Sequence, residues 1–254
     1  TDRPTARALS STLSGPEDGF LVCQTNIVYV DRTITGPNDG TTWSTAYSLL
    51  DNAFATSFAG DQVWVRGGQT FPEPGLTLNP GVAVCGSLKA NATFGKDSDF
   101  FNYPTTLEGG GSPLINLTRN NEVYAMDFER GGGSGFSGIY LNASGLTTFN
   151  LCAFRNCTAS DAPGGIDIVN MFAKVNFDRC VFQNNSSNTL TSGADYPGAL
   201  SVEFASDVRI TRSLFLFNSG SQLGTVSAGA IYTNLANLLV SNCTFVGNSG
   251  SRVY

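Results

Sequence analysis

A repeated pattern of apolar residues fills the second half of the chain and constrains the fold more than any other feature. Each repeat has an apolar residue, a small or sulfur-containing residue three positions later, and Phe two positions after that; the segments are 123–128, 149–154, 177–182, 210–215 and 240–245. The Phe residues recur at intervals of 26, 28, 33 and 30 residues, at Phe128, Phe154, Phe182, Phe215 and Phe245. A repeat of this length indicates a solenoid, a propeller or another array.

The local pattern within each repeat indicates short strands. Apolar residues alternate with polar ones, as in Val175 and Phe177 or Leu238 and Val240, and many are β-branched or aromatic. A second motif of two small residues and an aliphatic one recurs at the same intervals, at 137–139, 164–166, 198–200 and 229–231. A propeller blade needs roughly 40 to 45 residues, which is longer than this repeat. We therefore predict an all-β parallel β-helix, in which each coil buries its apolar face against its neighbours.

The rest of the chain divides by composition. Residues 1–22 are polar and predict an arm that is flexible or ordered by a partner. Residues 23–110 predict the N-terminal part of the β-helix, and residues 111–254 its repeat coils. Apolar residues at helical spacing predict a short helix over 43–57, as an N-terminal cap or as a crossover helix on one face. Its inner side is expected to carry Trp43, Leu49, Leu50 and Phe54.

The order of several segments, and the motif of the repeats, resemble those of known protein families. Segments 28–31, 36–43, 46–47, 61–65, 81–86 and 103–110 resemble, in this order, the opening of secreted right-handed parallel β-helix proteins. The Phe-x-x-Asn units at 182–185, 215–218 and 245–248 resemble the repeats of polymorphic outer-membrane proteins, although Cys157 and Gly131 replace Asn in two other units. The resemblance implies a right-handed β-helix, exposed at a surface, that acts in adhesion or as a scaffold and catalyses no reaction.

Composition excludes several other functions. The net charge is −6 and only 13% of residues are charged, so a basic face for nucleic acid is not expected. No apolar run approaches the roughly 18 residues of a membrane helix. Without His and without CxxC spacing the sequence predicts no zinc site, no Ser-His-Asp or Cys-His catalysis and no cofactor.

Seven sequons and six cysteines favour an oxidising compartment, secreted or at the cell surface. The N-glycosylation pattern occurs at Asn91, Asn116, Asn142, Asn156, Asn184, Asn185 and Asn242; the alternative is that Asn serves as a turn residue. We predict a disulfide between Cys23 and Cys85. Cys152 and Cys180 fall one coil apart, about 4.8 Å, and form either a disulfide or two stacked thiols. Cys157 and Cys243 pair elsewhere or stay free.

The third residue after Phe carries Asn in three repeats. Asn185, Asn218 and Asn248 should stack and hydrogen-bond along the axis as a ladder. The Phe column is expected to be core packing. Both features predict stabilisation of the solenoid and not a site.

These observations favour a structural or adhesive extracellular glycoprotein without catalysis. One alternative is a carbohydrate-active enzyme; its candidate residues are Asp161, Asp167, Asp178, Asp195, Glu203 and Asp207, with Lys174 and Arg179. The other is a module that binds a surface polysaccharide without cleaving it. The expected partners are N-linked glycans and copies of the same chain, joined head to tail by strand addition of residues 1–22 to an incomplete last coil; the alternative is that further coils follow in a longer protein.

Overall fold

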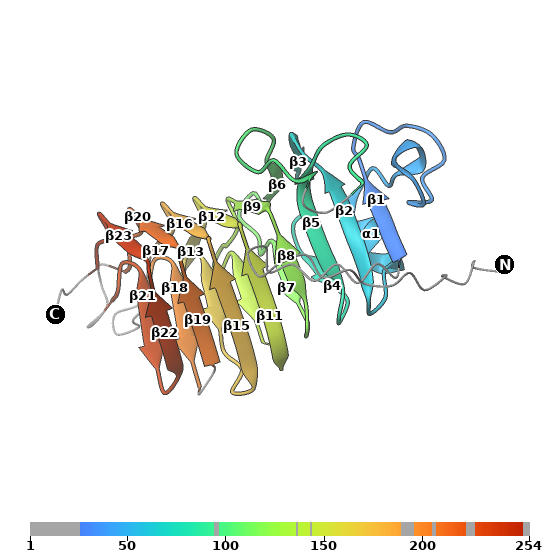
Figure 1. The fold of residues 1–254 in the computed structure, drawn as a ribbon. Coiled ribbons are helices and arrows are strands. Elements are labelled where there is room, and N and C mark those ends of the chain that lie inside the picture. The colour runs from blue at the N-terminus through green and yellow to red at the C-terminus, as the bar shows by residue number, and fades with distance from the viewer. Residues whose placement is uncertain are drawn as a thin grey trace.

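The chain winds into stacked coils that give one strand to each of three parallel sheets (Figure 1). The structure is a computed structural model and describes residues 26–93, 97–135, 137–142, 144–188, 196–204, 207–221 and 227–250. The predicted arm of residues 1–22 lies outside these ranges. The strands stack from β1 at one end of the molecule to β22 and β23 at the other, so the fold is the expected parallel β-helix.

Each coil passes through the sheets in the order 1, 2, 3. Within the described ranges, sheet 1 contains β1 (Asn26–Val30), β2 (Asp61–Arg66), β5 (Ala83–Leu88), β8 (Glu122–Tyr124), β11 (Gly145–Asn150), β15 (Ala173–Asp178), β19 (Asp207–Thr211) and β22 (Asn237–Ser241). Sheet 2 contains β3 (Gln69–Phe71), β6 (Thr105–Glu108), β9 (Met126–Glu129), β12 (Ala153–Arg155), β16 (Val181–Gln183), β20 (Leu214–Leu216) and β23 (Thr244–Val246). Sheet 3 contains β4 (Leu76–Leu78), β7 (Ile115–Leu117), β10 (Ile139–Leu141), β14 (Ile166–Ile168), β18 (Leu200–Glu203) and β21 (Ile231–Asn234). A small fourth sheet pairs β13 (Thr158–Ser160) with β17 (Ser186–Asn188).

Side chains alternate between the inside and the outside of each coil, as the period of a strand requires. In β15 every second residue, beginning with Ala173, is buried, and Lys174 and Asn176 face outward. The inward side chains of all three sheets form one core that runs from Val28 to Phe215. The outward positions of each sheet are therefore the ones available for function.

The Phe residues of the repeat form one column inside sheet 2. The strand register aligns them across five successive coils, and neighbouring ring centroids are 4.4 to 5.3 Å apart; the column is Phe128, Phe154, Phe182, Phe215 and Phe245. The aliphatic residues of the second motif stack in the same way in sheet 3. The register predicted from the spacing of the repeat is confirmed.

Left-handed backbone conformations turn the chain between sheets. Five residues that lead from sheet 1 to sheet 2 have φ between 52° and 55°; they are Ala125, Leu151, Arg179, Arg212 and Asn242. This conformation costs most residues roughly 1 to 2 kcal/mol, and Asn tolerates it better. The stacked coils on either side therefore hold a residue such as Leu151 in a conformation that it does not prefer.

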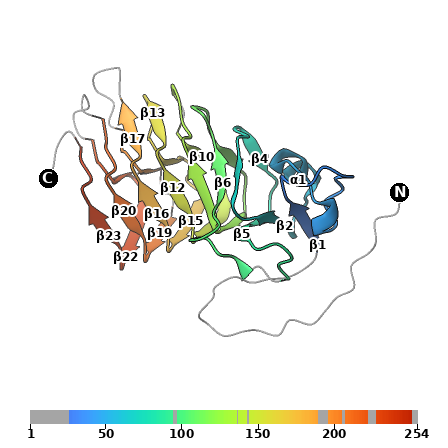
Figure 2. The same cartoon turned by 90° about the horizontal axis from the view of Figure 1, so that it is seen from above.

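Helix α1 (Leu50–Thr56) covers the N-terminal end of the core (Figure 2). It packs beside β4 and β1, in the place where the first coil would otherwise contribute a strand to sheet 3. Leu50, Ala53 and Phe54 are buried and join the core. The helix thus caps the solenoid, as predicted. No helix in the described ranges is long and apolar enough to cross a membrane.

The helix predicted over residues 43–57 is interrupted in its middle, which corrects its length. A 3-10 turn (Trp43–Thr45) precedes α1, and between them the backbone N–H of Tyr47 donates to the carbonyl oxygen of Tyr29 at 2.9 Å. This bridge ties the segment to β1, so the helix cannot continue through it. Trp43 therefore packs against Tyr29 on the outer face of sheet 1, and Leu49 is exposed; neither lies on the inner side of a helix.

Candidate functional site

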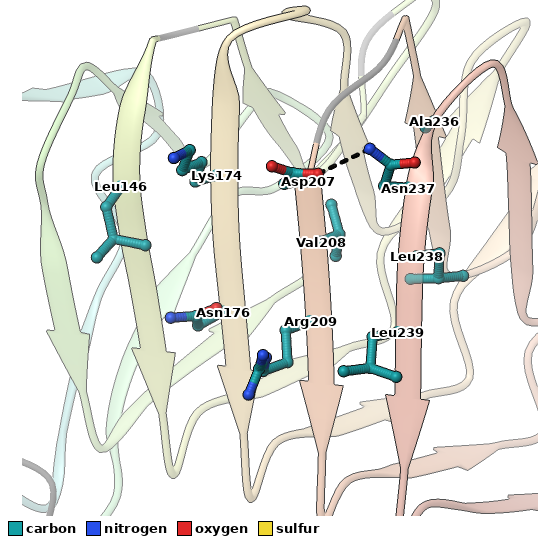
Figure 3. Close-up of a pocket in the computed structure, with 10 residues that line it drawn as sticks. All are labelled: Leu146, Lys174, Asn176, Asp207, Val208, Arg209, Ala236, Asn237, Leu238 and Leu239. Atoms are coloured by element: carbon teal, nitrogen blue, oxygen red, sulfur yellow. Dashed lines mark hydrogen bonds between the residues drawn. The ribbon is translucent and has the colours of Figure 1, made fainter.

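A shallow groove of about 760 Å³ lies on the outer face of sheet 1, across β11, β15, β19 and β22 (Figure 3). The alternation of the strands brings polar side chains to this face, because the intervening residues fill the core. The outward residues that line it are Leu146, Lys174, Asn176, Asp207, Arg209, Asn237 and Leu239. Of these, Lys174 and Asp207 are strand neighbours in adjacent coils, and so are Asn176 and Arg209.

The polar groups of the groove are only partly used within the protein. The Asn237 side-chain amide donates to the Asp207 carboxylate at 2.9 Å. Among the residues that the structure describes, Lys174 and Arg209 form no ion pair. Leu146 and Leu239 lie at opposite ends of the groove and are 45% and 51% exposed. The groove therefore offers charge, amide groups and apolar surface to a ligand.

An exposed apolar ridge follows the turns between sheet 3 and sheet 1, beside the groove. It consists of Met171, Phe172, Phe204 and Leu235, which are 58%, 68%, 49% and 77% exposed. The backbone N–H of Phe204 donates to the carbonyl oxygen of Asn234, which places Phe204 and Leu235 in adjacent coils at one position. Adjacent exposed apolar side chains such as Phe204 and Leu235 are typical of interaction sites.

A second group of polar residues lies on the outer face of sheet 3. Asp167 on β14 neighbours Ser201 on β18, whose hydroxyl donates to the Glu203 carboxylate at 3.1 Å. Burial and, after it, the nearby negative charge of Glu203 raise the pKa of Asp167 to about 7, although a hydrogen bond with Ser201 lowers it. One Asp167 carboxylate oxygen is buried and has no hydrogen-bond partner. This carboxyl group is thus partly protonated near neutral pH.

Of the other residues proposed for catalysis, Asp178 does not join this pair. Asp178 lies at the end of β15 in sheet 1, and its carboxylate accepts hydrogen bonds from Arg212 at 2.6 and 2.8 Å and from Arg179 at 3.2 Å. Burial opposes the ionised form of Asp178, but these bonds and that of Thr211 leave its pKa lowered. Asp161 lies in a turn near the pair, because burial and, after it, the charges of Asp161, Asp167 and Glu203 raise the pKa of Tyr196. Asp195 lies outside the described residues. The sequence thus supplied the residue types, but only the structure shows which of them meet.

The pKa of Asp167 predicts a pH dependence of stability. The folded-state pKa, about 7, lies above the unfolded value of about 3.9, so the folded chain binds more protons between these values. The contribution of this group to stability is complete below about pH 4 and is lost as the pH rises through about 7. We expect Asp167→Asn to reduce the fall in the free energy of unfolding between pH 4 and pH 7 by about 3 kcal/mol, measured by urea denaturation. Exposed Asp207→Asn is the control; an unchanged pH profile in Asp167→Asn would contradict the assignment.

Asn185, Asn218 and Asn248 stack inside the turn that follows sheet 2. The Asn185 side-chain amide donates to Asn218 Oδ1 at 3.0 Å, and that of Asn218 donates to Asn248 Oδ1 at 2.8 Å. The same two oxygens accept the backbone N–H groups of Asn185 and Asn218, and Asn185 Oδ1 accepts that of Cys157 at 3.1 Å. The ladder therefore pairs backbone N–H groups as well as its own side-chain amides. The spacing of the asparagines does not indicate this second role.

The ladder excludes one of the expected glycosylation positions. Six sequon asparagines are exposed, namely Asn91, Asn116, Asn142, Asn156, Asn184 and Asn242. Asn185 is fully buried, and its Nδ2 atom, where a glycan would be attached, donates to the Phe154 carbonyl oxygen at 2.9 Å as well as to Asn218. The expectation at Asn185 is therefore corrected: in the folded chain this residue serves the ladder.

The cysteines in the described ranges are all free thiols; they are Cys85, Cys152, Cys157, Cys180 and Cys243. The disulfide predicted between Cys23 and Cys85 is not seen: Cys85 is a buried thiol, and Cys23 lies outside the described residues. Cys152 and Cys180 form the predicted column as two stacked thiols. Each Sγ donates to a carbonyl oxygen of the preceding coil, at 3.4 and 3.5 Å, in place of a disulfide. Burial also raises the pKa of Cys180, which keeps this thiol protonated.

Comparisons with known proteins do not assign the chain. No protein-family model, curated protein or solved structure matches it. The resemblance to polymorphic outer-membrane proteins therefore stays a prediction. Within the part of the chain that the structure describes, no group of three or more His, Cys, Asp or Glu side chains is placed to hold a metal ion. The groove on sheet 1 is the candidate site that fold and chemistry together favour.

The groove was not predicted as a site, although part of its signal is in the sequence. The sequence marks Lys174 and Asp207 only as candidates for catalysis, and it does not single out Asn176, Arg209 or Asn237. All of them occupy the outward positions of strands whose inward positions are the apolar residues of the repeat. Writing the repeats in register would have placed these polar residues on one face.

Proposed function

We propose that the protein is an extracellular, non-catalytic solenoid that presents its outer faces as a structural or adhesive surface. The observation that carries the proposal is that the groove on sheet 1 is lined by a single carboxylate, Asp207, beside two cations and two side-chain amides. Cleavage of a glycoside needs an acid and a second carboxylate placed together about one substrate. The groove instead combines charged, amide and apolar groups that suit binding without cleavage.

A carbohydrate-active enzyme is the second candidate, and one observation favours it. Asp167 has a raised pKa and lies beside Glu203, and two carboxyl groups in different protonation states are what a glycosidase requires. In that reading Asp167 would donate the proton to the leaving oxygen. The exposed tyrosine neighbour of Asp167 in register, Tyr140, would then pack against the sugar.

One preparation of the protein, secreted from a eukaryotic host, tests the proposal. Peptide mapping after enzymatic deglycosylation should find glycans at exposed sequons, such as Asn116 and Asn142, and none at Asn185, because its Nδ2 is buried in the ladder. Asn184→Gln should remove any glycan from the overlapping pair of sequons, since only Asn184 is exposed. Glycan at Asn185 in the folded, secreted protein would contradict the structure of the ladder.

The same preparation should release no reducing ends or unsaturated sugars from a panel of plant, fungal and bacterial polysaccharides. Turnover by the wild-type protein that Asp167→Asn abolishes would establish the enzyme instead. Head-to-tail assembly of copies stays a prediction, because residues 1–22 lie outside the described residues.

A further inference from the structure

The groove on sheet 1 is more basic than the rest of this acidic protein. Two cations, Lys174 and Arg209, project from it on adjacent coils, against one carboxylate, Asp207. Elsewhere in the described ranges most arginines are paired with carboxylates; these are Arg66, Arg130, Arg155, Arg179 and Arg212. The net charge of the chain is −6, so this concentration of unpaired positive charge is local.

The two cations are free to bind an anion from solution. Lys174 and Arg209 are exposed, and no carboxylate of the described residues lies within ion-pair distance of either. The Asp207 carboxylate lies between Lys174 and Asn237 and accepts a hydrogen bond from the Asn237 amide at 2.9 Å (Figure 3). An exposed guanidinium and an exposed ammonium group without an ion-pair partner can both bind carboxylate or sulfate oxygens.

The remaining groups of the groove fit a sugar polymer better than a small anion. Leu146 on β11 and Leu239 on β22 are half exposed at the two ends of the groove, with Asn176 between them on β15. Adjacent strands are about 4.8 Å apart, so each coil adds one side chain to a row along the solenoid axis, as in the row Leu146, Lys174, Asp207 and Asn237. A polysaccharide chain presents hydroxyl groups, apolar ring faces and, where present, anionic groups at regular short intervals along such a row.

We propose that the groove binds an anionic polysaccharide, extended along the axis of the solenoid. Its carboxylate or sulfate groups bind Lys174 and Arg209, its hydroxyl groups hydrogen-bond to Asn176 and Asn237, and its apolar ring faces pack on Leu239. The proposal rests on the proposed function and specifies its ligand. It also explains why the exposed residues of this face are not uniformly acidic in an acidic protein.

Binding of the full chain to three probes tests the proposal: polygalacturonate, a sulfated glycan such as heparin, and a neutral β-glucan. We expect binding to one or both anionic polymers and at least tenfold weaker binding to the neutral one. Binding should weaken as ionic strength rises, since exposed charges are screened. Preference for polygalacturonate or for heparin identifies whether the natural ligand carries carboxylate or sulfate groups.

The double variant Lys174→Ala/Arg209→Ala should lower the affinity at least tenfold and leave the urea midpoint unchanged, because both side chains are exposed. Lys89→Ala is the matched control, since Lys89 is an exposed cation far from the groove, paired with Asp99. Unchanged affinity in the double variant, equal binding of the neutral glucan, or equal binding of single-stranded DNA would each overturn the proposal. If the protein is secreted and cleaves no polysaccharide but also binds no anionic polymer, the proposed ligand is wrong and the proposed function still stands. If the protein cleaves a polysaccharide, the proposed non-catalytic function itself is wrong.

Discussion

Phe182→Ala is expected to lower the free energy of unfolding by about 3 to 5 kcal/mol, the usual cost of removing a buried aromatic ring. Phe182 is fully buried in the middle of the column, with its ring centroid 4.4 Å from that of Phe215 and 4.9 Å from that of Phe154. Phe177 packs against its edge at 5.4 Å. The rigid column cannot collapse into the space, because the strand register holds each neighbouring ring in its own coil.

The loss should also be local, because each coil contacts only its neighbours. Hydrogen exchange should show the largest loss of protection in β12, β16 and β20, and little change in β2 or β5. Phe172→Ala is the control: Phe172 is 68% exposed on the ridge, and its removal should change stability by no more than about 0.5 kcal/mol. A cost below about 1 kcal/mol for Phe182→Ala in urea denaturation would contradict the role assigned to the column.

The spacing of the repeat was enough to predict the fold and the register of its strands. A parallel coil places like residues above like, so Phe154 had to lie over Phe128 and under Phe182 once the period was recognised. The same argument placed Cys152 beside Cys180 and Asn185 beside Asn218. Period and polarity carry this information because inward and outward positions alternate strictly along each strand.

The N-terminal region was predicted less well, because its interactions are not repeated. Helical spacing alone could not show that Tyr47 pairs with Tyr29 and so divides the helix.

The raised pKa of Asp167 could not be predicted from the sequence either, since it depends on burial and on Glu203, 36 residues later in the sequence (167 to 203) and one coil away. Loops of different length between coils separate residues in sequence that the stacking brings together.

The Asn ladder explains why polar residues can occupy the interior of this solenoid. Each asparagine at its turn position accepts the backbone N–H of the preceding coil through Oδ1 and donates through Nδ2 to a carbonyl oxygen of that coil and to the next rung, as Asn218 does with Phe182 and Asn248. Buried polar groups cost stability only when they lack partners. The ladder therefore closes the turns between sheets 2 and 3 while leaving no side-chain amide of its inner rungs unpaired.

Asn218→Ala should consequently lower the free energy of unfolding by about 4 kcal/mol, although it removes a small side chain. Asn218 is fully buried at the central rung. Its loss would leave the Asn185 backbone N–H without its acceptor and the Phe182 carbonyl oxygen without the Asn218 donor, and the Asn185 side-chain amide would keep only its bond to the Phe154 carbonyl oxygen. Each unsatisfied buried group costs roughly 1 to 3 kcal/mol.

Urea denaturation of Asn218→Ala and of a control variant, Asn188→Ala, provides the measurement. Asn188 is an exposed residue of β17, and its truncation should change stability by no more than about 0.5 kcal/mol. Asn218→Asp separates hydrogen bonding from size, because it keeps the acceptor oxygen and the volume but removes both donors to Phe182 and Asn248. If the ladder acts through hydrogen bonds, Asn218→Asp must also lower the free energy of unfolding at neutral pH, because its buried carboxylate would lack a cation. A urea midpoint close to that of the wild type would show that the ladder contributes only packing.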